Sequence, residues 1–320
     1  MKKTIAITCG DINGIGPEIS LKAIQKLSNQ HINFIFICPS NVYEYYKKLL
    51  NLTVNLIPVY DINDIDTNRN YLFVLPETKM DFGKITKESG LISFLAIEAS
   101  IKLFKNKKIN AVVTSPISKE AIKLAGFDFP GHTEIYSNSE NNNNYTMTFI
   151  SHKLKAALTT IHIPLKDVPK RLSREQLEIT IQNAYNICVK YYKRLKPKLA
   201  ILSLNPHAGE QGILGTEEIE IIIPTINNSQ YKDSLYGPFP ADAFFGNKLY
   251  KNFDFIIGHY HDQVLIPFKL LSFEKGVNFT AGLNIIRTSP DHGTAFDISN
   301  KNIASPTSMI EAIKVACKFS

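Results

Sequence analysis

The sequence predicts an α/β fold built from two lobes. Short apolar runs alternate with amphipathic segments over most of the chain, the rhythm of a mostly parallel sheet covered by helices. In the middle of the chain two apolar runs flank a polar turn, which is typical of an antiparallel hairpin and indicates a second subdomain with a mixed sheet. A chain of 320 residues is also long enough for two lobes with a large buried core.

The elements follow from the periodicity of apolar residues. Buried strands are predicted at residues 4–8, 33–38, 54–59, 72–75 and 111–114. Helices are predicted over 17–27, which has proline near its first turn, and over the amphipathic stretch 90–104. The hairpin strands are 145–150 and 154–161, and a long helix at 174–193 precedes a strand at 198–204. The asparagine run 141–144 is predicted to be a solvated loop.

The composition favours a soluble, reduced, cytoplasmic protein without a membrane partner. No window approaches the roughly 18 uninterrupted apolar residues of a membrane helix. The basic start runs directly into a strand pattern with no small-residue cleavage site, which argues against a signal peptide. The four cysteines are far apart in sequence, which argues against a disulfide framework and against a thiolate metal site.

The formal net charge is +7, but the lysines are scattered and form no basic stripe interleaved with aromatic residues. We therefore expect no nucleic-acid partner. Solubility explains most of these lysines, and a dispersed positive surface also suits small anionic ligands such as phosphates.

Polar residues of chemical interest follow the predicted strands, where open α/β sheets place their ligands. The first such segment, residues 10–18, is a strand-to-helix turn with three glycines. Its backbone N–H groups suit an anion at a helix N-terminus, but its spacing is not that of a GxGxxG dinucleotide fingerprint. A tight structural turn is the alternative interpretation.

The second segment combines the turn 114–119 with residues 131–134. Its Ser/Thr-rich turn and Lys119 suit a phosphate or a carboxylate. His132 and Thr133 begin the next predicted helix, where they would either hydrogen-bond a substrate or form a helix cap with a capping-box acid.

Three histidines, His162, His207 and His261, each follow a predicted strand. Three imidazoles with an open position can make a catalytic divalent-metal site, although the long intervals between them carry no local metal motif. Asp242 and Asp262 are candidates for orienting such ligands.

Two further groups lie near the C-terminus. Lys269, Asn278 and Arg287 are polar residues set among apolar ones, and a cation of this kind either binds a phosphate or lies over an apolar surface. Residues 291–297 form a polar loop before the last helix, in which a glycine is flanked by histidine and threonine and can approach a nucleotide.

Taken in order, these segments resemble the 4-hydroxythreonine-4-phosphate dehydrogenase family of pyridoxal phosphate biosynthesis. The resemblance spans nearly the whole chain, and its most specific parts are LNPHAGE, YHDQ and IRTS followed by DHGTA. The matching segments are residues 10–18, 114–119, 131–134, 160–165, 204–218, 237–245, 260–263, 269–289 and 291–295. The sequence departs from the family pattern at Ile12-Asn13, at Val264 and at residues 299–302.

The resemblance implies the fold of the isocitrate/isopropylmalate dehydrogenase group, in which two α/β/α lobes enclose a central cleft. The expected first lobe comprises residues 1–113 and 285–320, and the second comprises 114–284. A homodimer is expected to complete each active site.

The resemblance also assigns roles to the candidate residues. His162, His207 and His261 would bind one divalent metal ion, with zinc, magnesium and cobalt as the candidates. The substrate and its phosphate would be held by His132, Thr133, Lys269, Asn278 and Arg287. The loop residues Asp291, His292, Gly293 and Thr294 would contact NAD or NADP. The proton acceptor stays open between Lys269, Asp242 and a metal-linked water, with Asp262 in a supporting role.

The implied reaction is the metal-dependent oxidation of 4-(phosphooxy)-L-threonine at C3 by NAD(P). The resulting 3-keto acid loses CO₂ to give 3-amino-2-oxopropyl phosphate, a precursor of pyridoxine 5′-phosphate. Two alternatives remain: a sibling dehydrogenase acting on threonate or erythronate 4-phosphate, and a metal-dependent phosphohydrolase that does not use NAD.

Overall fold

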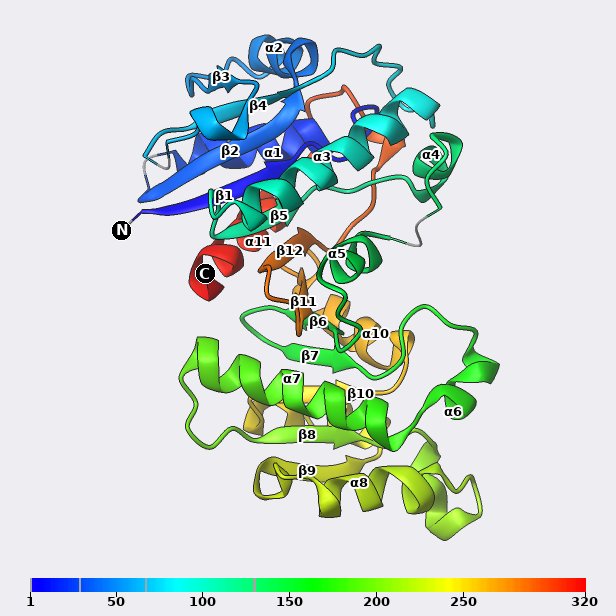
Figure 1. The fold of residues 1–320 in the computed structure, drawn as a ribbon. Coiled ribbons are helices and arrows are strands. Elements are labelled where there is room, and N and C mark those ends of the chain that lie inside the picture. Colours follow the sequence, from blue (N-terminus) through cyan, green and yellow to red (C-terminus); the bar gives the residue numbers. More distant parts are fainter. Residues whose placement is uncertain (1, 29, 67, 129–130) are drawn as a thin grey trace. The chain divides into compact units, whose positions relative to one another are not determined.

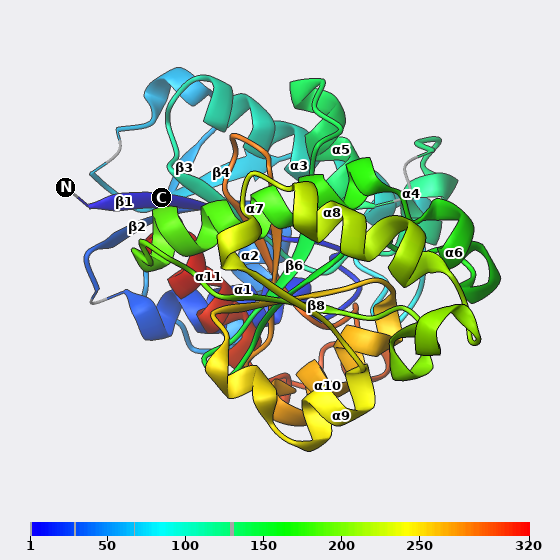
Figure 2. The same ribbon diagram turned by 90° about the horizontal axis from the view of Figure 1, so that it is seen from below.

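The computed structural model describes residues 2–28, 30–66, 68–128 and 131–320. The chain divides into two compact units (Figures 1 and 2). Unit 1 comprises Met1–Asn143 and Leu283–Ser320, and unit 2 comprises Asn144–Gly282. The chain thus passes from unit 1 into unit 2 and returns to unit 1.

Unit 1 contains a parallel sheet whose strands lie in the order β3-β4-β2-β1-β5-β12. Each of these neighbouring pairs is parallel. The strands are β1 (Lys3–Thr8), β2 (Ile32–Pro39), β3 (Ile57–Val59), β4 (Tyr71–Leu75), β5 (Ala111–Thr114) and β12 (Arg287–Pro290). All eight residues of β2 are buried, and residues 34–39 form a continuous apolar run, because a central parallel strand is covered on both faces.

The helices of unit 1 cover both faces of this sheet. Helix α3 crosses one face in Figure 1, whereas α1 and α11, which pack against each other, lie on the opposite face. The helices are α1 (Gly16–Leu27), α2 (Ser40–Leu49), α3 (Lys87–Lys105), α4 (Lys119–Leu124), α5 (His132–Glu140) and α11 (Thr307–Phe319). Short 3₁₀ turns lie at Ile62–Asp64 and Phe296–Ile298.

Helices α4 and α5 belong to unit 1, so the first segment of this unit ends at Asn143 rather than at the expected residue 113. The reason is their packing on α3. A Cβ atom at Gly90 of α3 would lie only 1.9 Å from the carbonyl oxygen of Ala121 in α4. The hydroxyls of Ser100 in α3 and Tyr136 in α5 are 2.6 Å apart in a buried hydrogen bond.

Unit 2 contains a mixed sheet in the order β11-β6-β7-β10-β8-β9. β6 pairs antiparallel with both β7 and β11, and the remaining pairs are parallel. The strands are β6 (Thr146–Ile150), β7 (Lys155–Leu158), β8 (Leu199–Leu202), β9 (Leu235–Phe239), β10 (Phe255–Gly258) and β11 (Val277–Ala281). The antiparallel β6–β7 pair is the hairpin that the sequence predicted.

The helices of unit 2 are α6 (Val168–Arg171), α7 (Arg174–Tyr192), α8 (Ile223–Asn228), α9 (Ala241–Gly246) and α10 (His261–Ser272). α7 packs along the sheet and contacts β7, β8 and β10. A separate apolar cluster joins the sheet to α9 and α10 through Phe149, Phe244 and Phe268, each at most 2% exposed. This cluster fixes α10, which begins at the candidate ligand His261.

Candidate active site

A cavity of about 190 Å³ lies within unit 1, at the carboxyl ends of β5 and β12. This is the edge of a parallel sheet at which α/β proteins bind their ligands. Three segments supply its walls: the turn after β5, the start of α5 shortly after it in sequence, and the distant β12 with its following loop. The lining residues are Thr114, Ser115, Pro116, Ile117, Lys119, Gly131, His132, Arg287, Ser289, Pro290, His292 and Gly293.

Arg287 is the most firmly placed cation of this cavity. Its side chain is only 4% exposed, and its Nε and Nη2 atoms donate hydrogen bonds of 3.0 and 2.7 Å to Thr114 Oγ1. The parallel pairing of β12 with β5 places Arg287 opposite Val112 and so brings it near Thr114. Burial lowers the pKa of Arg287 to about 10, so the guanidinium is still charged at neutral pH.

His132 lines the same cavity as a neutral group. Burial, together with the charges of Arg287 and Lys119, lowers the pKa of its imidazole well below the ordinary value. Its Nε2 atom is buried and has no hydrogen-bond partner among the described residues. A buried polar atom without a partner is costly, so this atom is suited to bind a ligand. The alternative of a helix cap is not observed, because the N-cap residue of α5 is Gly131.

The glycine-rich turn at residues 10–18 supports the cavity wall through its close packing. Gly10 has φ +68°, and a Cβ atom there would lie 2.4 Å from the carbonyl oxygen of Pro116. A Cβ atom at Gly14 would lie 2.7 Å from the carbonyl oxygen of Thr294, which accepts a 2.9 Å hydrogen bond from Ile15 N–H. The small size of these glycines therefore allows the turn to pack against the segment after β5 and against the loop after β12. This close packing agrees with the interpretation of residues 10–18 as a tight structural turn.

Asp11 is fully buried in the same turn and carries an ionisable group. Its Oδ1 atom accepts a hydrogen bond from Asn13 N–H at 3.0 Å, and its Oδ2 atom accepts one from the Ser89 hydroxyl at 3.1 Å. Burial raises the pKa of Asp11 from 3.8 to about 6, and these hydrogen bonds offset only part of that effect.

Asp11→Asn should therefore stabilise unit 1 at neutral pH. Because the folded chain holds the Asp11 proton more tightly than the unfolded chain, the wild-type free energy of unfolding falls as pH rises from about 4 to 6. Above pH 6 the full penalty is present, at most about 3 kcal/mol, whereas asparagine keeps an acceptor and cannot ionise. Urea unfolding at pH 5 and pH 7.5 should show a larger gain at pH 7.5. An equal gain at both pH values would contradict this role of the carboxylate.

Two of the predicted cofactor residues, His292 and Gly293, line the cavity, whereas Asp291 and Thr294 flank them in sequence. The loop is held to the neighbouring backbone at Thr294, as described above, and His292 is exposed. Thr133, one of the predicted substrate residues, is buried in the first turn of α5 directly beside His132.

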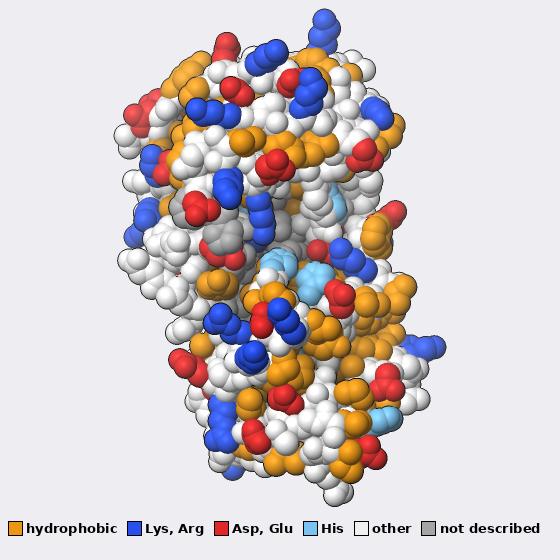
Figure 3. Space-filling model, turned by 90° about the vertical axis from the view of Figure 1, so that its right-hand side faces the viewer, with side chains coloured by type: hydrophobic (Ala, Val, Ile, Leu, Met, Phe, Trp, Pro, Cys, Tyr) orange, Lys and Arg blue, Asp and Glu red, His pale blue; other side chains and the backbone are white. Residues whose placement is uncertain are grey.

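In unit 2 the structure brings two of the three predicted metal ligands together. The ring centroids of His162 and His261 are 5.8 Å apart, and both side chains are exposed. Figure 3 shows histidine side chains at the surface of one face of the molecule. Among the residues that the structure describes, no three His, Cys, Asp or Glu side chains are grouped closely enough to hold a metal ion.

The His162–His261 pair nevertheless has the chemistry of a metal-ligand pair. Asp262 Oδ1 lies 2.7 Å from His261 Nδ1, which orients the ring and leaves Nε2 available, as an outer carboxylate does in histidine metal sites. The adjacent His259 is different: it is fully buried, its Nε2 lies 2.7 Å from the carbonyl oxygen of Leu202, and burial lowers its pKa to about 4. The His162–His261 pair is therefore suited to contribute two ligands of a divalent-cation site, but the described residues group no third ligand with it.

His207 lies on an exposed loop with an unusual backbone. Residues 207–211 all have left-handed φ values, between 44° and 78°. The carboxylate of Glu218, which is 1% exposed, accepts hydrogen bonds of 2.8 Å from Leu204 N–H and Asn205 N–H. Its other oxygen accepts one of 2.9 Å from Asn205 Nδ2. Glu218 thus fixes the entry to this loop.

The remaining candidates are distributed over unit 2. Asp242 is exposed in the first turn of α9, and Lys269 is half-buried near the end of α10. Asn278 is half-buried on β11, and its Oδ1 atom is buried without a hydrogen-bond partner among the described residues. That orphan acceptor identifies Asn278 as a further group suited to a ligand.

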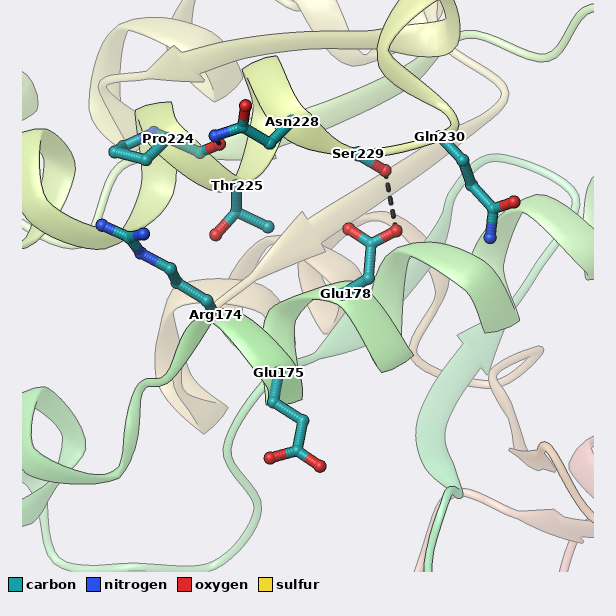
Figure 4. A pocket seen from close by; sticks show the side chains of 8 residues that line it. All are labelled: Arg174, Glu175, Glu178, Pro224, Thr225, Asn228, Ser229 and Gln230. Atoms are coloured by element: carbon teal, nitrogen blue, oxygen red, sulfur yellow. Dashed lines mark hydrogen bonds between the residues drawn. The ribbon is translucent and has the colours of Figure 1, made fainter.

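A larger cavity of about 410 Å³ lies between α7 and α8, but it contains none of the predicted site residues (Figure 4). Glu178 accepts a 2.8 Å hydrogen bond from the Ser229 hydroxyl there, and Arg174 donates to the carbonyl oxygen of Glu220. The charged side chains of this cavity therefore either form hydrogen bonds within the protein or, in the case of Glu175, point away from the other labelled side chains (Figure 4). The unit 1 cavity, with two cations and an orphan imidazole, is the better candidate.

The fold is that of a two-unit α/β protein, and its unit 1 cavity carries two cations at the carboxyl edge of a parallel sheet. The solved isocitrate dehydrogenase of Methylococcus capsulatus matches 98% of this chain and 84% of its own with a TM-score of 0.53 at 15% identity, which confirms the predicted fold class. Among the helices of the described residues, none is both long and apolar enough to span a membrane.

The chain belongs to the family described as pyridoxal phosphate biosynthetic protein PdxA, whose model matches residues 29–316. It is 41% identical to the 4-hydroxythreonine-4-phosphate dehydrogenase of Sulfurihydrogenibium sp. (strain YO3AOP1), over 98% of this chain and 97% of that protein. It is 35% identical to the D-threonate 4-phosphate dehydrogenase of Salmonella typhimurium, over 99% of each.

Among solved structures, the 4-hydroxythreonine-4-phosphate dehydrogenase of Klebsiella pneumoniae matches with a TM-score of 0.86 at 33% identity, over 100% of this chain and 98% of that one. These comparisons confirm the predicted family, and the chain is an oxidoreductase of the dehydrogenase class.

Proposed function

We propose that this chain oxidises 4-(phosphooxy)-L-threonine at C3 with NAD or NADP and releases 3-amino-2-oxopropyl phosphate after decarboxylation. The observation that carries the proposal is the unit 1 cavity, in which buried Arg287 and the orphan Nε2 of His132 are placed for an anionic group. The high identity to relatives named for this activity supports the same substrate.

Arg287 and His132 would bind and orient the phosphorylated substrate, with Thr133, Lys269 and Asn278 as the other proposed contacts. Hydride leaves C3 for the nicotinamide, which residues 291–294 would hold. The hydroxyl proton passes to Lys269, Asp242 or a water molecule. Because the new carbonyl lies β to the carboxylate, the keto acid can then lose CO₂.

A divalent cation is proposed to bind to His162, His207 and His261. When bound, such a cation lowers the pKa of a coordinated hydroxyl and stabilises enolate charge. Asp262 orients His261 toward it by the contact described above. Zinc, magnesium and cobalt all remain candidates.

We also propose a homodimer in which the active site is shared. Support comes from α10, where Ile266, Leu270 and Phe273 at its end are 58%, 83% and 76% exposed. At this spacing they form one apolar stripe on the helix that begins at His261.

One assay tests the activity and separates the alternatives. Reduction of NAD or NADP is followed by absorbance with 4-(phosphooxy)-L-threonine, with D-threonate 4-phosphate and with erythronate 4-phosphate. Preference for the first supports the proposal, and preference for threonate 4-phosphate supports the sibling activity carried by the Salmonella typhimurium relative. Release of inorganic phosphate without NAD reduction would instead indicate the phosphohydrolase.

Arg287→Met should raise the KM for the phosphorylated substrate about ten- to a hundredfold, because a charge-assisted hydrogen bond contributes roughly 1.5–3 kcal/mol. The KM for NAD should change far less. The measurement is steady-state kinetics with each substrate varied in turn. A change confined to the KM for NAD would contradict the assignment of Arg287 to the phosphate.

A further inference from the structure

We propose that Lys119, at the start of α4, is a further substrate-binding residue that holds the phosphate group together with Arg287. This proposal rests on the proposed function and deepens it. Lys119 lines the same cavity as Arg287 and His132, but it comes from the turn after β5 rather than from α5 or β12.

Lys119 is exposed at the first position of α4, and its side chain extends toward the start of α5. Ser118 caps α4 by accepting a 3.1 Å hydrogen bond from Ala121 N–H, which sets where the helix starts. A Cβ atom at Gly131 would lie 3.6 Å from Lys119 Cε and 3.9 Å from Nζ. The end of the Lys119 side chain therefore lies within van der Waals distance of this position, beside the first turn of α5.

Three positive features thus meet at one small cavity: the Lys119 ammonium, the Arg287 guanidinium and the N-terminus of the nine-residue helix α5. The positive charges repel one another, and an anion bound between them would relieve this repulsion. The orphan Nε2 of His132 adds a neutral hydrogen-bonding group. No acidic residue lines the cavity within the described part of the chain.

The charge of this cavity fits a phosphate better than a carboxylate. Two cations beside a neutral imidazole match the −1.5 to −2 charge of a phosphate monoester near neutral pH. A single carboxylate would leave one cation without compensation. Glu134, whose Oε2 would lie 3.2 Å from a Cβ at Gly131, acts on the charge of Arg287 but is not a lining residue.

The test compares Lys119→Met and Lys119→Arg with Lys123→Met, a control in the same helix whose exposed side chain does not line the cavity. Calorimetric titration of the full chain with inorganic phosphate is the primary readout. Lys119→Met should weaken phosphate binding about ten- to a hundredfold, Lys119→Arg should retain most of it, and Lys123→Met should match wild type. Acetate should compete poorly with phosphate.

Kinetics supplies the second readout. Lys119→Met should raise the KM for the phosphorylated substrate while the KM for NAD stays within about twofold of wild type. Wild-type phosphate affinity in Lys119→Met, no phosphate binding by wild type, or equally strong acetate binding would each overturn the proposal. Phosphate binding that depends on Lys119, without NAD reduction by any phosphorylated substrate, would instead overturn the proposed function and leave the phosphate site standing.

Discussion

Replacing His261 by alanine is expected to lower turnover by more than about a hundredfold while unit 2 stays folded. Loss of an outer partner of a metal ligand alone costs roughly 10–100-fold in metal affinity or activity, and loss of the ligand should cost more. The side chain is exposed at the start of α10, so its removal leaves the Phe149–Phe244–Phe268 cluster intact. Turnover and bound metal should both be measured, the latter by elemental analysis.

His152→Ala is the matched control, because His152 is also exposed in unit 2 but lies in the β6–β7 turn. It should retain wild-type metal content and turnover. His162→Ala and His207→Ala should behave like His261→Ala. Full activity of metal-stripped His207→Ala without added metal would rule out the proposed metal site.

A mixing experiment tests whether that site is shared between subunits. His132→Ala and His261→Ala are each expected to be inactive. If His261 completes the partner's site, their heterodimer contains one site with both defects and one intact site, and part of the activity returns. Failure to recover activity, together with sedimentation of a fully active monomer, would contradict the shared site.

Gly90→Ala is expected to destabilise unit 1 by more than about 3 kcal/mol, the upper end of ordinary overpacking. The new Cβ would lie 1.9 Å from the carbonyl oxygen of Ala121 and 2.2 Å from its carbonyl carbon. These are backbone atoms, so α3 and α4 would have to move apart. Denaturant unfolding should show the loss directly, and phosphate binding should weaken because α4 begins at Lys119.

Gly246→Ala provides the control for this prediction. A Cβ atom at Gly246 meets nothing within 4 Å among the described residues, so its effect should stay within about 0.5 kcal/mol. Equal stability of Gly90→Ala and Gly246→Ala would contradict the prediction, because it would show that α3 and α4 can move apart at little cost in free energy.

Most elements could be predicted because their apolar periodicity is local. The predicted strand at 111–114 and helix at 174–193 reappear as β5 and α7 within one residue. The predicted strand at 54–59 is shorter, since only Ile57–Val59 pairs with β4. Helix α2 is absent from the predicted elements, and its N-cap residue, Pro39, makes no side-chain cap.

The site was harder to predict because its geometry depends on long-range pairing. His132 and Arg287 were expected to bind substrate, but their common cavity depends on the alignment of β12 with β5. Thr114, which holds Arg287, was visible only as part of a polar turn. The left-handed run at 207–211 has no periodic signal, because its backbone has neither helical nor extended geometry.

Unit 1 is built from two chain segments separated by the whole of unit 2, and this arrangement affects the order in which the two units can fold during synthesis. Every residue of unit 2 is synthesised before Leu283, so this unit can fold while translation continues. Unit 1 must wait for β12 and α11, and Lys3 Nζ finally donates to the carbonyl oxygen of Ser320. Arg287 is part of β12, so the cavity in unit 1 cannot be completed before the whole of unit 2 has been synthesised. The folding of unit 2 therefore does not depend on this cavity, whereas the cavity depends on a segment made after unit 2.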